Sequence, residues 1–214
     1  MKFKKVRKNE PGGFGVKQLV LASANPGKLR ELSAILTQLG YELVPQGELG
    51  IVEVAETGTT FVENAIIKAR NAARHSGLPA LADDSGIEVD ALNGAPGVYS
   101  ARFSGPEAND DANNALLVEK LAEVPAEQRT ARYRAVIVLM RHAADPAPLI
   151  CEGSWEGLIQ LQPSGSGGFG YDPYFYLPEL GCSSAQLSAE EKNRISHRGK
   201  ALARLKEHLL RGNV

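Results

Sequence analysis

The stretch Leu81-Ala82-Asp83-Asp84-Ser85-Gly86 decides the fold of this chain, because a short apolar run ends there in two adjacent carboxylates. A second apolar run, Ile87 to Val89, follows at once. If Leu81-Ala82 is the end of a buried strand, the acidic pair lies where a strand of the core meets solvent. Open α/β sheets bind their ligands at such strand ends, so the stretch predicts an α/β fold with a site here.

The acidic pair itself allows two interpretations. Two neighbouring ionised carboxylates repel each other, so one of them keeps its proton unless a cation lies between them. Mg²⁺ suits such a place, because it takes oxygen ligands and keeps several waters. The alternative is a simple acidic turn, since Asp-Asp-Ser-Gly is also good turn chemistry. These residues alone leave both interpretations open.

Length and composition limit the classes of protein to consider. The 214 residues are 43% hydrophobic, which is enough for one sizeable core, and we expect one domain with two lobes. Lys and Arg number 24 and Asp and Glu 25, so the net charge of −1 offers no basic field for a nucleic acid polymer.

The compartment is predicted from what the sequence lacks. Cys151 and Cys182 have no metal-ligand spacing and fit a reduced, cytosolic protein best. No apolar run approaches the roughly 20 residues of a membrane span, and no secretory segment follows the start. We therefore expect a cytoplasmic protein without a membrane partner.

The first 17 residues differ from the rest. They are basic, rich in glycine and without hydrophobic periodicity, so we predict a disordered or extension tail over 1–17 and the folded domain over 18–214.

A strand, a polar turn and a helix follow this tail. Gln18–Ala22 is an apolar strand, and apolar residues from Leu29 to Leu39 recur at helical spacing until Gly40. The turn between them, Ser23-Ala24-Asn25-Pro26-Gly27-Lys28, precedes free helix N–H groups and adds the charge of its lysine. Such a helix start favours phosphate binding, but an ordinary capped helix has the same pattern, and no Walker A sequence is present.

A second helix is predicted from Thr60, which forms a capping box with Glu63, to the stop signal at Gly77. Lys68 falls inside this helix and Glu56 lies just before it. Either residue can serve a bound ligand or simply face solvent.

The remaining elements are predicted from periodicity and β-branched runs. The predicted strands are Glu42–Pro45, Ile51–Val54, Arg132–Met140 and Leu149–Ile159, and Asn109–Val124 has a helical pattern. The two long strands are expected to pair as a hairpin and to extend the sheet into a second lobe.

A glycine-rich segment, Gly165–Pro173, matches G-x-G-x-x-G by letter. The dinucleotide fingerprint needs a helix immediately afterwards, and Asp172-Pro173 disfavours one, so we reject that motif. What remains is a loop that carries one aromatic ring, Phe169. The ring can stack on a flat base or anchor the loop in the core.

The last two helices bring positive charge to helix starts. Ser188 and Glu191 form a capping box that places Lys192 early in a short helix. Ser196 then caps the terminal helix, with His197 and Arg198 in its first turn. The helix dipole disfavours cations there, which indicates an anionic or acceptor-rich ligand.

Taken in order, five motifs are specific: S-x-N-x-x-K, E-T-G-T-T-F-x-E-N-A-x-x-K-A, A-D-D-S-G, G-G-F-G-Y-D-P and S-H-R-G-K-A. This set resembles the inosine/xanthosine triphosphate pyrophosphatases, from Lys17 to about Gly212. The resemblance implies an elongated two-lobed α/β fold, with a long twisted mixed central sheet, helices packed on it and a substrate cleft between the lobes. It also implies a homodimer and Mg²⁺-dependent hydrolysis of ITP, dITP and XTP to the monophosphate and pyrophosphate.

The resemblance also implies a role for each matching residue. The substrate-binding residues are Ser23, Ala24, Asn25, Pro26, Gly27, Lys28, Lys68, Ser85, Phe169, Gly170, Tyr171, Asp172, Lys192, His197 and Arg198. The metal ligands are Glu56, Asp83 and Asp84, and Asp84 is the proton acceptor. Two rival functions stay open: a pyrophosphatase of similar fold for modified pyrimidine triphosphates, and a nucleotide-binding sensor without catalysis.

Overall fold

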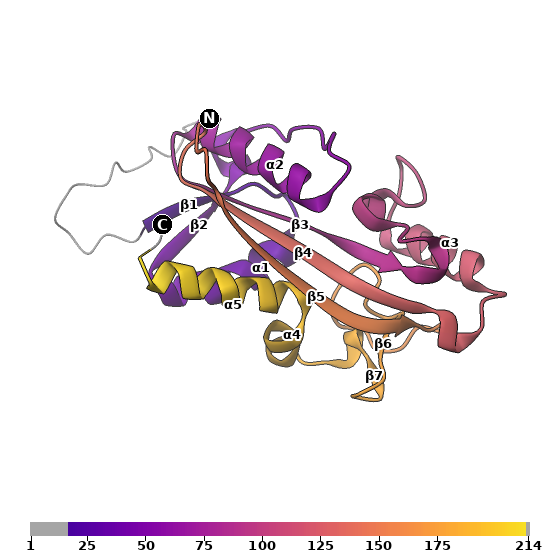
Figure 1. Ribbon diagram of the computed structural model, residues 1–214. Helices are drawn as coiled ribbons and strands as arrows, with labels where there is room; N and C mark the ends of the chain where they lie inside the picture. The colour runs from indigo at the N-terminus through magenta and orange to yellow at the C-terminus, as the bar shows by residue number, and fades with distance from the viewer. Residues whose placement is uncertain (1–16, 213–214) are drawn as a thin grey trace. The chain divides into compact units, whose positions relative to one another are not determined.

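The computed structural model, drawn in Figure 1, describes residues 17–212. These residues form two compact units. The first unit contains residues 17–83, 137–151 and 202–212. The second contains residues 84–136 and 152–201. The predicted tail over 1–16 lies outside the described residues, and Lys17 belongs to the first strand rather than to a tail.

Seven strands form one mixed sheet, in the order β2-β1-β3-β4-β5-β6-β7. The strands are β1 (Lys17–Leu21), β2 (Tyr41–Pro45), β3 (Ala80–Val89), β4 (Thr130–Met140), β5 (Leu149–Ile159), β6 (Phe175–Leu177) and β7 (Cys182–Ser183). The α-helices are α1 (Pro26–Leu36), α2 (Phe61–Ser76), α3 (Asp110–Leu121), α4 (Ala189–Ile195) and α5 (His197–Leu210). An α/β fold with a mixed sheet is therefore confirmed, whereas the substrate cleft stays a prediction. No helix of the described residues is both long and apolar enough to cross a membrane.

The first unit is built from parallel strands joined by helices. β1 pairs in parallel with β2 and β3, with Val20 opposite Ala80 and Leu21 opposite Leu81. Parallel neighbours need long connections, which α1 and α2 supply while they pack on β2 and β1. Leu32 and Leu36 of α1 are buried, each contributing about 1.5–3 kcal/mol of apolar burial.

Local sequence signals explain where these helices begin and end. Thr60 and Glu63 form the expected capping box of α2, and Gly77 ends it with a left-handed φ of 68°. Asn25 caps α1, which ends at Leu36, and a short 3₁₀ turn continues to Leu39. The predicted strand Ile51–Val54 is wrong, because this segment pairs with no strand of the described sheet.

The second unit has an antiparallel edge and its own core. β5 pairs with β6 and β6 with β7, both antiparallel. The core gathers buried residues from β3, β4, β5, β6 and α3, among them Ile87, Leu117, Tyr133, Trp155 and Phe175. A strand, β6, follows the glycine-rich segment, which confirms that the segment is no dinucleotide fingerprint.

The acidic pair lies inside a strand, and here the predicted strand end at Ala82 is wrong. β3 runs through Asp83 and Asp84, whose exposed fractions are 0% and 6%. The chain stays extended because Ile87 and Val89 pack in the core of the second unit. The alternative of an acidic surface turn is thereby excluded.

Candidate active site

The turn between β1 and α1 is held by its own side chains. Oδ1 of Asn25 accepts hydrogen bonds from the backbone N–H groups of Gly27 (2.8 Å) and Lys28 (3.1 Å). The Asn25 N–H donates to Oγ of Ser23 at 3.2 Å. The start of α1 thus has an ordinary cap, and phosphate binding there stays a prediction. What it adds to a site is a fixed direction for the Lys28 side chain.

Two lysines of the first unit converge on Asp83. The ammonium of Lys28 lies 2.9 Å from Oδ2 of Asp83 and donates to its carbonyl oxygen at 3.1 Å. The ammonium of Lys68 lies 2.9 Å from Oε1 of Glu56 and donates to the same carbonyl at 3.3 Å. Both lysine side chains are 14% exposed. Two cations and two acids, distant in sequence, therefore form one cluster, which we call the lysine–acid cluster.

The segment that carries Glu56 is fixed by α2. The N–H of Gly58 donates to Oδ1 of Asn64 at 2.8 Å, and Asn64 is fully buried. A Cβ on Gly58 would lie 2.6 Å from the Cβ of Glu63, so only glycine allows this close approach.

The lysine–acid cluster has the chemistry of a polyphosphate site. Ammonium groups that now bind carboxylates can bind phosphate oxygens instead, which leaves the oxygens of Glu56 and Asp83 for a hard cation. Within residues 17–212, no three His, Cys, Asp or Glu side chains gather closely enough to hold a metal ion. Mg²⁺ needs only one or two carboxylates when substrate phosphates and water complete its shell, so the two carboxylates of the cluster fit it.

Asp84 follows Asp83 in β3 and opens the second unit. The residue to which the resemblance assigns proton transfer therefore directly follows the carboxylate that binds Lys28.

In the second unit, a buried carboxylate organises the glycine-rich segment. Oδ2 of Asp172 accepts from the Lys192 ammonium (2.5 Å) and from the N–H of Phe169 (2.8 Å). Oδ1 accepts from the hydroxyls of Ser184 (2.8 Å) and Tyr133 (3.4 Å). Asp172 is 2% exposed and Lys192 7%, so their ion pair is almost fully removed from solvent.

The glycines make this arrangement sterically feasible. A Cβ on Gly168 would lie 2.0 Å from Oδ2 of Asp172, and the φ of Gly168 is +76°. Any larger residue would both adopt a strained backbone and collide with the carboxylate.

Phe169 is half-buried and lies outside the core cluster of its unit. The Lys192 ammonium is 5.0 Å from the centre of its ring, and the Arg198 guanidinium carbon is 5.8 Å away. Tyr171 anchors the segment instead: it is 5% exposed and its hydroxyl donates to the Ser100 carbonyl at 2.7 Å. Burial raises the pKa of the Tyr171 hydroxyl, which keeps it a donor.

The start of α5 brings His197 and Arg198 to the same region. The hydroxyl of Ser196 accepts from the Gly199 N–H at 3.1 Å, as predicted for a cap. Nη2 of Arg198 donates to Oγ of Ser85 at 3.0 Å. Both His197 and Arg198 are buried, with 4% and 2% exposed.

The structure adds Tyr133 to the residues of the candidate site, a position that the sequence did not indicate. Its ring stacks on His197 with 4.6 Å between centres and an angle of 10°, while its hydroxyl reaches Asp172. Burial, and then the charge of Asp172, raise its pKa well above the ordinary value. The alternating burial of β4 marks Tyr133 as an inward residue, but nothing in that pattern indicates its two partners.

The structure thus forms two groups of predicted site residues. Lys28, Lys68, Glu56 and Asp83 meet in the first unit, and Phe169, Asp172, Lys192 and Arg198 meet in the second. The first group is suited to phosphates and a cation, and the second to a flat ring with acceptor atoms.

Comparison with known proteins decides the family. The model of the Ham1 family matches residues 19–208. The chain belongs to the Ham1 family.

Relatives of this Ham1-family chain share most of its length. A dITP/XTP pyrophosphatase of Photobacterium profundum is 57% identical over 88% of this chain and 95% of its own. A HAM1 protein of Coxiella burnetii has a solved structure with a TM-score of 0.85, at 49% identity over 91% of this chain and 99% of its own. A nucleoside-triphosphatase/dITP/XTP pyrophosphatase of Mycobacterium abscessus gives a TM-score of 0.71 at 45% identity, over 88% and 98%.

Proposed function

We propose that this chain hydrolyses non-standard purine nucleoside triphosphates (ITP, dITP and XTP) to the monophosphate and pyrophosphate. The observation that carries the proposal is the match to the Ham1 family over residues 19–208, with relatives named dITP/XTP pyrophosphatase. The two groups of site residues support it, since one is suited to a polyphosphate and the other to a base.

Phosphate binding is assigned to the start of α1 and to three lysines. When substrate binds, the ammonium groups of Lys28 and Lys68 exchange their carboxylate partners for phosphate oxygens. A triphosphate offers them more negative charge and more acceptor oxygens than the two carboxylates do. Lys192 adds charge while it keeps Asp172 in place. These lysines compensate the negative charge of the triphosphate locally, although the net charge of the whole chain is −1.

The proposed cofactor is Mg²⁺, with ligands from Glu56, Asp83 and Asp84. When bound, the ion neutralises charge that develops on the phosphate oxygens. Asp84 orients a water molecule and accepts its proton as the water oxygen attacks the α-phosphorus. The bond from the α-phosphorus to the bridging oxygen breaks, and pyrophosphate leaves with the electron pair.

Base selection is assigned to the second group. Phe169 offers its ring for stacking, and Arg198 offers only hydrogen-bond donors. Hypoxanthine and xanthine present an acceptor at position 6, whereas adenine presents a donor. An amino group facing Arg198 leaves buried donors unpaired, at a cost of about 1–3 kcal/mol each. Guanine shares the carbonyl, so rejection of GTP requires a further contact near position 2.

The proposal also covers the compartment and the oligomeric state of the enzyme. We place the enzyme in the cytoplasm as a homodimer, with no nucleic acid polymer or membrane as partner. The two cysteines form no disulfide, which is consistent with a reducing compartment.

The test is release of pyrophosphate with Mg²⁺ present, measured for ITP, dITP and XTP beside ATP, dATP and GTP. We expect kcat/KM at least about 100-fold higher for the first three. Faster turnover of modified pyrimidine triphosphates would support the pyrimidine-specific rival. Tight binding of ITP without pyrophosphate release would identify a sensor.

A further inference from the structure

The position of the Phe169 ring depends on the backbone around it, because the ring is half-buried and lies outside the core cluster of its unit. Gly168 and Gly170 flank it, with left-handed φ angles of 76° and 62°. Glycine has the freest backbone of all residues, so these two glycines do not fix the ring by themselves. The groups that hold the neighbouring backbone therefore decide where the ring lies.

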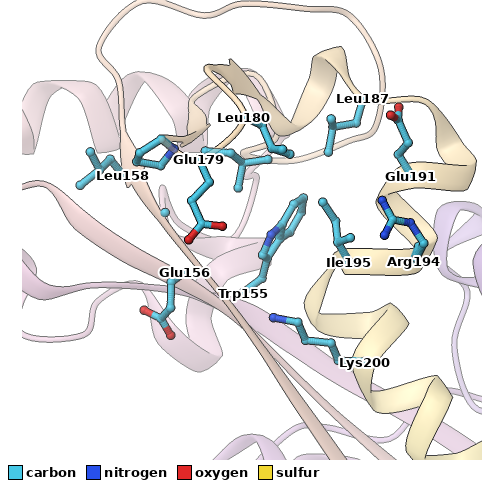
Figure 2. Close-up of a pocket in the computed structure, with 13 residues that line it drawn as sticks. Trp155, Glu156, Leu158, Glu179, Leu180, Leu187, Glu191, Arg194, Ile195 and Lys200 are labelled. Atoms are coloured by element: carbon cyan, nitrogen blue, oxygen red, sulfur yellow. The ribbon is translucent and has the colours of Figure 1, made fainter.

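Helix α4 holds one part of this backbone through the ion pair of Lys192 and Asp172. Oδ2 of Asp172 accepts from the Phe169 N–H, and Lys192 binds the same oxygen. Helix α4 itself packs against the core cluster through Ile195, which lines the same surface hollow as Trp155 (Figure 2). The glycine-rich segment is thus fixed from the side of α4.

Helix α3 holds the other part of this backbone, because it binds both backbone groups of Gly170. The Gly170 N–H donates to Oδ2 of Asp110 at 2.7 Å, and the Gly170 carbonyl oxygen accepts from Nδ2 of Asn114 at 3.0 Å. Asp110 and Asn114 are four positions apart, so they lie on one face of the helix. Leu117 and Leu121 of the same helix are fully buried in the core cluster, which gives the two polar side chains a rigid support.

Asn114 is a poor choice of residue for the stability of α3, since asparagine has a low propensity for helix interiors. It is 6% exposed, and its Oδ1 atom has no hydrogen-bond partner in the described part of the chain. A buried acceptor without a partner costs free energy that an apolar side chain avoids. The neighbouring Asn113 uses both of its polar atoms: Oδ1 accepts from the Ser104 N–H, and Nδ2 donates to the Ala101 carbonyl. The benefit of Asn114 therefore lies in its bond to Gly170.

Asp110 contributes a charged acceptor to this contact. An N–H that donates to a carboxylate forms a stronger bond than one that donates to a neutral oxygen. Asp110 and Asp111 are both exposed acids in the first turn of α3, where the helix dipole favours negative charge. In the described part of the chain, only Asp110 of these two acids hydrogen-bonds to the glycine-rich segment. The two acids therefore allow a comparison between a general effect of charge and a specific contact.

We propose that Asp110 and Asn114 are positioning residues for base recognition: they fix Gly170 and thereby hold the Phe169 ring where the purine stacks. This inference rests on the proposed function, because it takes Phe169 as a contact of the base. Neither Asp110 nor Asn114 is assigned a contact with substrate. The same stacked base is present in the bound substrate and in the transition state. Loss of either positioning residue should therefore raise KM and leave kcat nearly unchanged.

Pyrophosphate release from ITP with Mg²⁺ tests Asp110 through KM and kcat. Asp110→Ala should raise KM at least about tenfold and change kcat by less than about threefold. Asp110→Asn keeps an oxygen acceptor for the Gly170 N–H, and its KM should stay within about threefold of wild type. Asp111→Ala is the matched control, because it removes an acid from the same first turn, and it should keep the wild-type KM. Equal increases of KM in the two alanine variants would overturn the proposal.

Asn114→Leu separates positioning from a merely structural role. Leucine has the same branched shape and leaves no buried polar atom, so the urea midpoint of unfolding should equal or exceed that of wild type. The KM for ITP should nevertheless rise at least about threefold, because the bond to Gly170 is lost. Asn113→Leu is the contrasting variant, and it should lower the midpoint because it breaks paired hydrogen bonds. If Asn114→Leu lowers the midpoint as much as Asn113→Leu, Asn114 is structural and its part of the proposal is overturned.

Amide hydrogen exchange of the ligand-free protein tests the contact with α3 without any activity. Peptides that contain Gly170 should exchange faster in Asp110→Ala than in wild type, and at the wild-type rate in Asp111→Ala. Unchanged exchange in Asp110→Ala, with an active wild type, would overturn the positioning role alone. A wild type that neither binds nor hydrolyses ITP would refute the proposed function and the role in base recognition together, even if the exchange rates show that α3 holds Gly170.

Discussion

The buried pair of Asp172 and Lys192 allows a quantitative prediction about how the glycine-rich segment is held. Asp172→Asn keeps the shape of the side chain and removes its charge. The Lys192 ammonium, with 7% exposed, then loses the carboxylate of its buried ion pair. Breaking a buried pair in this way costs about 3–5 kcal/mol. A domain of this size has a stability of about 5–15 kcal/mol, so the loss is large but leaves a folded protein.

The assay is urea unfolding followed by fluorescence. Trp155 is the single tryptophan and lies in the core of the same unit as the pair, so it reports on that unit. For Asp172→Asn we expect a lower urea concentration at the midpoint of unfolding. The dependence of the unfolding free energy on urea concentration should not change, because the surface exposed on unfolding stays the same. The double change Asp172→Asn with Lys192→Met should recover part of the loss, since it removes the buried ammonium together with its carboxylate partner.

The matched control is an exposed pair in the same unit. Nε of Arg134 lies 3.1 Å from Oε2 of Glu88, with 44% and 27% of the side chains exposed. Glu88→Gln should cost no more than about 1 kcal/mol. If Asp172→Asn costs no more than this control, the buried pair does not hold the segment and our reasoning is refuted.

Three further predictions concern single residues. Gly168→Ala should raise KM for ITP and lower stability, because its Cβ meets Asp172; an alanine variant with wild-type KM and midpoint would exclude this steric role. Arg198→Ala should raise KM for ITP by about 5- to 150-fold and change ATP hydrolysis far less; equal losses on both would mean that Arg198 serves the phosphates. Hydrogen bonds from Arg132 and then Thr130 lower the pKa of Asp90 to about 2 from 3.8. The stability that this carboxylate contributes is therefore present above about pH 4 and lost as the pH falls through 2, so the difference in stability between wild type and Asp90→Asn should shrink from pH 4 to pH 2 and vanish below that. A difference that stays constant from pH 4 to pH 2 would contradict this assignment.

Elements with local signals were predictable from the sequence. The capping boxes at Thr60 and Ser188 depend on residues three positions apart, and both helices begin as predicted. The long strands β4 and β5 follow from their β-branched and alternating runs. These elements can be predicted from the sequence because residues close together in the chain determine them.

The errors arose where distant residues decide the structure. Asp83 and Asp84 have strong turn propensity, yet sheet pairing and the Lys28 ammonium keep them in a buried strand. Ile51–Val54 has a strand-like sequence but no neighbouring strand to pair with.

The organisation of the site depends on distant contacts as well. Asp172 and Lys192 were each predicted to contact substrate, but their ion pair was not, because 20 residues separate them. Tyr133 is still more remote in sequence from His197, on which it stacks.

The central claim is that Asp84 accepts the proton when water attacks the α-phosphorus. The most direct measurement is pyrophosphate release from dITP at saturating substrate and Mg²⁺, for wild type, Asp84→Asn and the exposed control Asp111→Asn. The proposed mechanism predicts that Asp84→Asn still binds dITP but loses about 100- to 10,000-fold in kcat, while Asp111→Asn keeps wild-type turnover. Turnover of Asp84→Asn within a few-fold of wild type would contradict it.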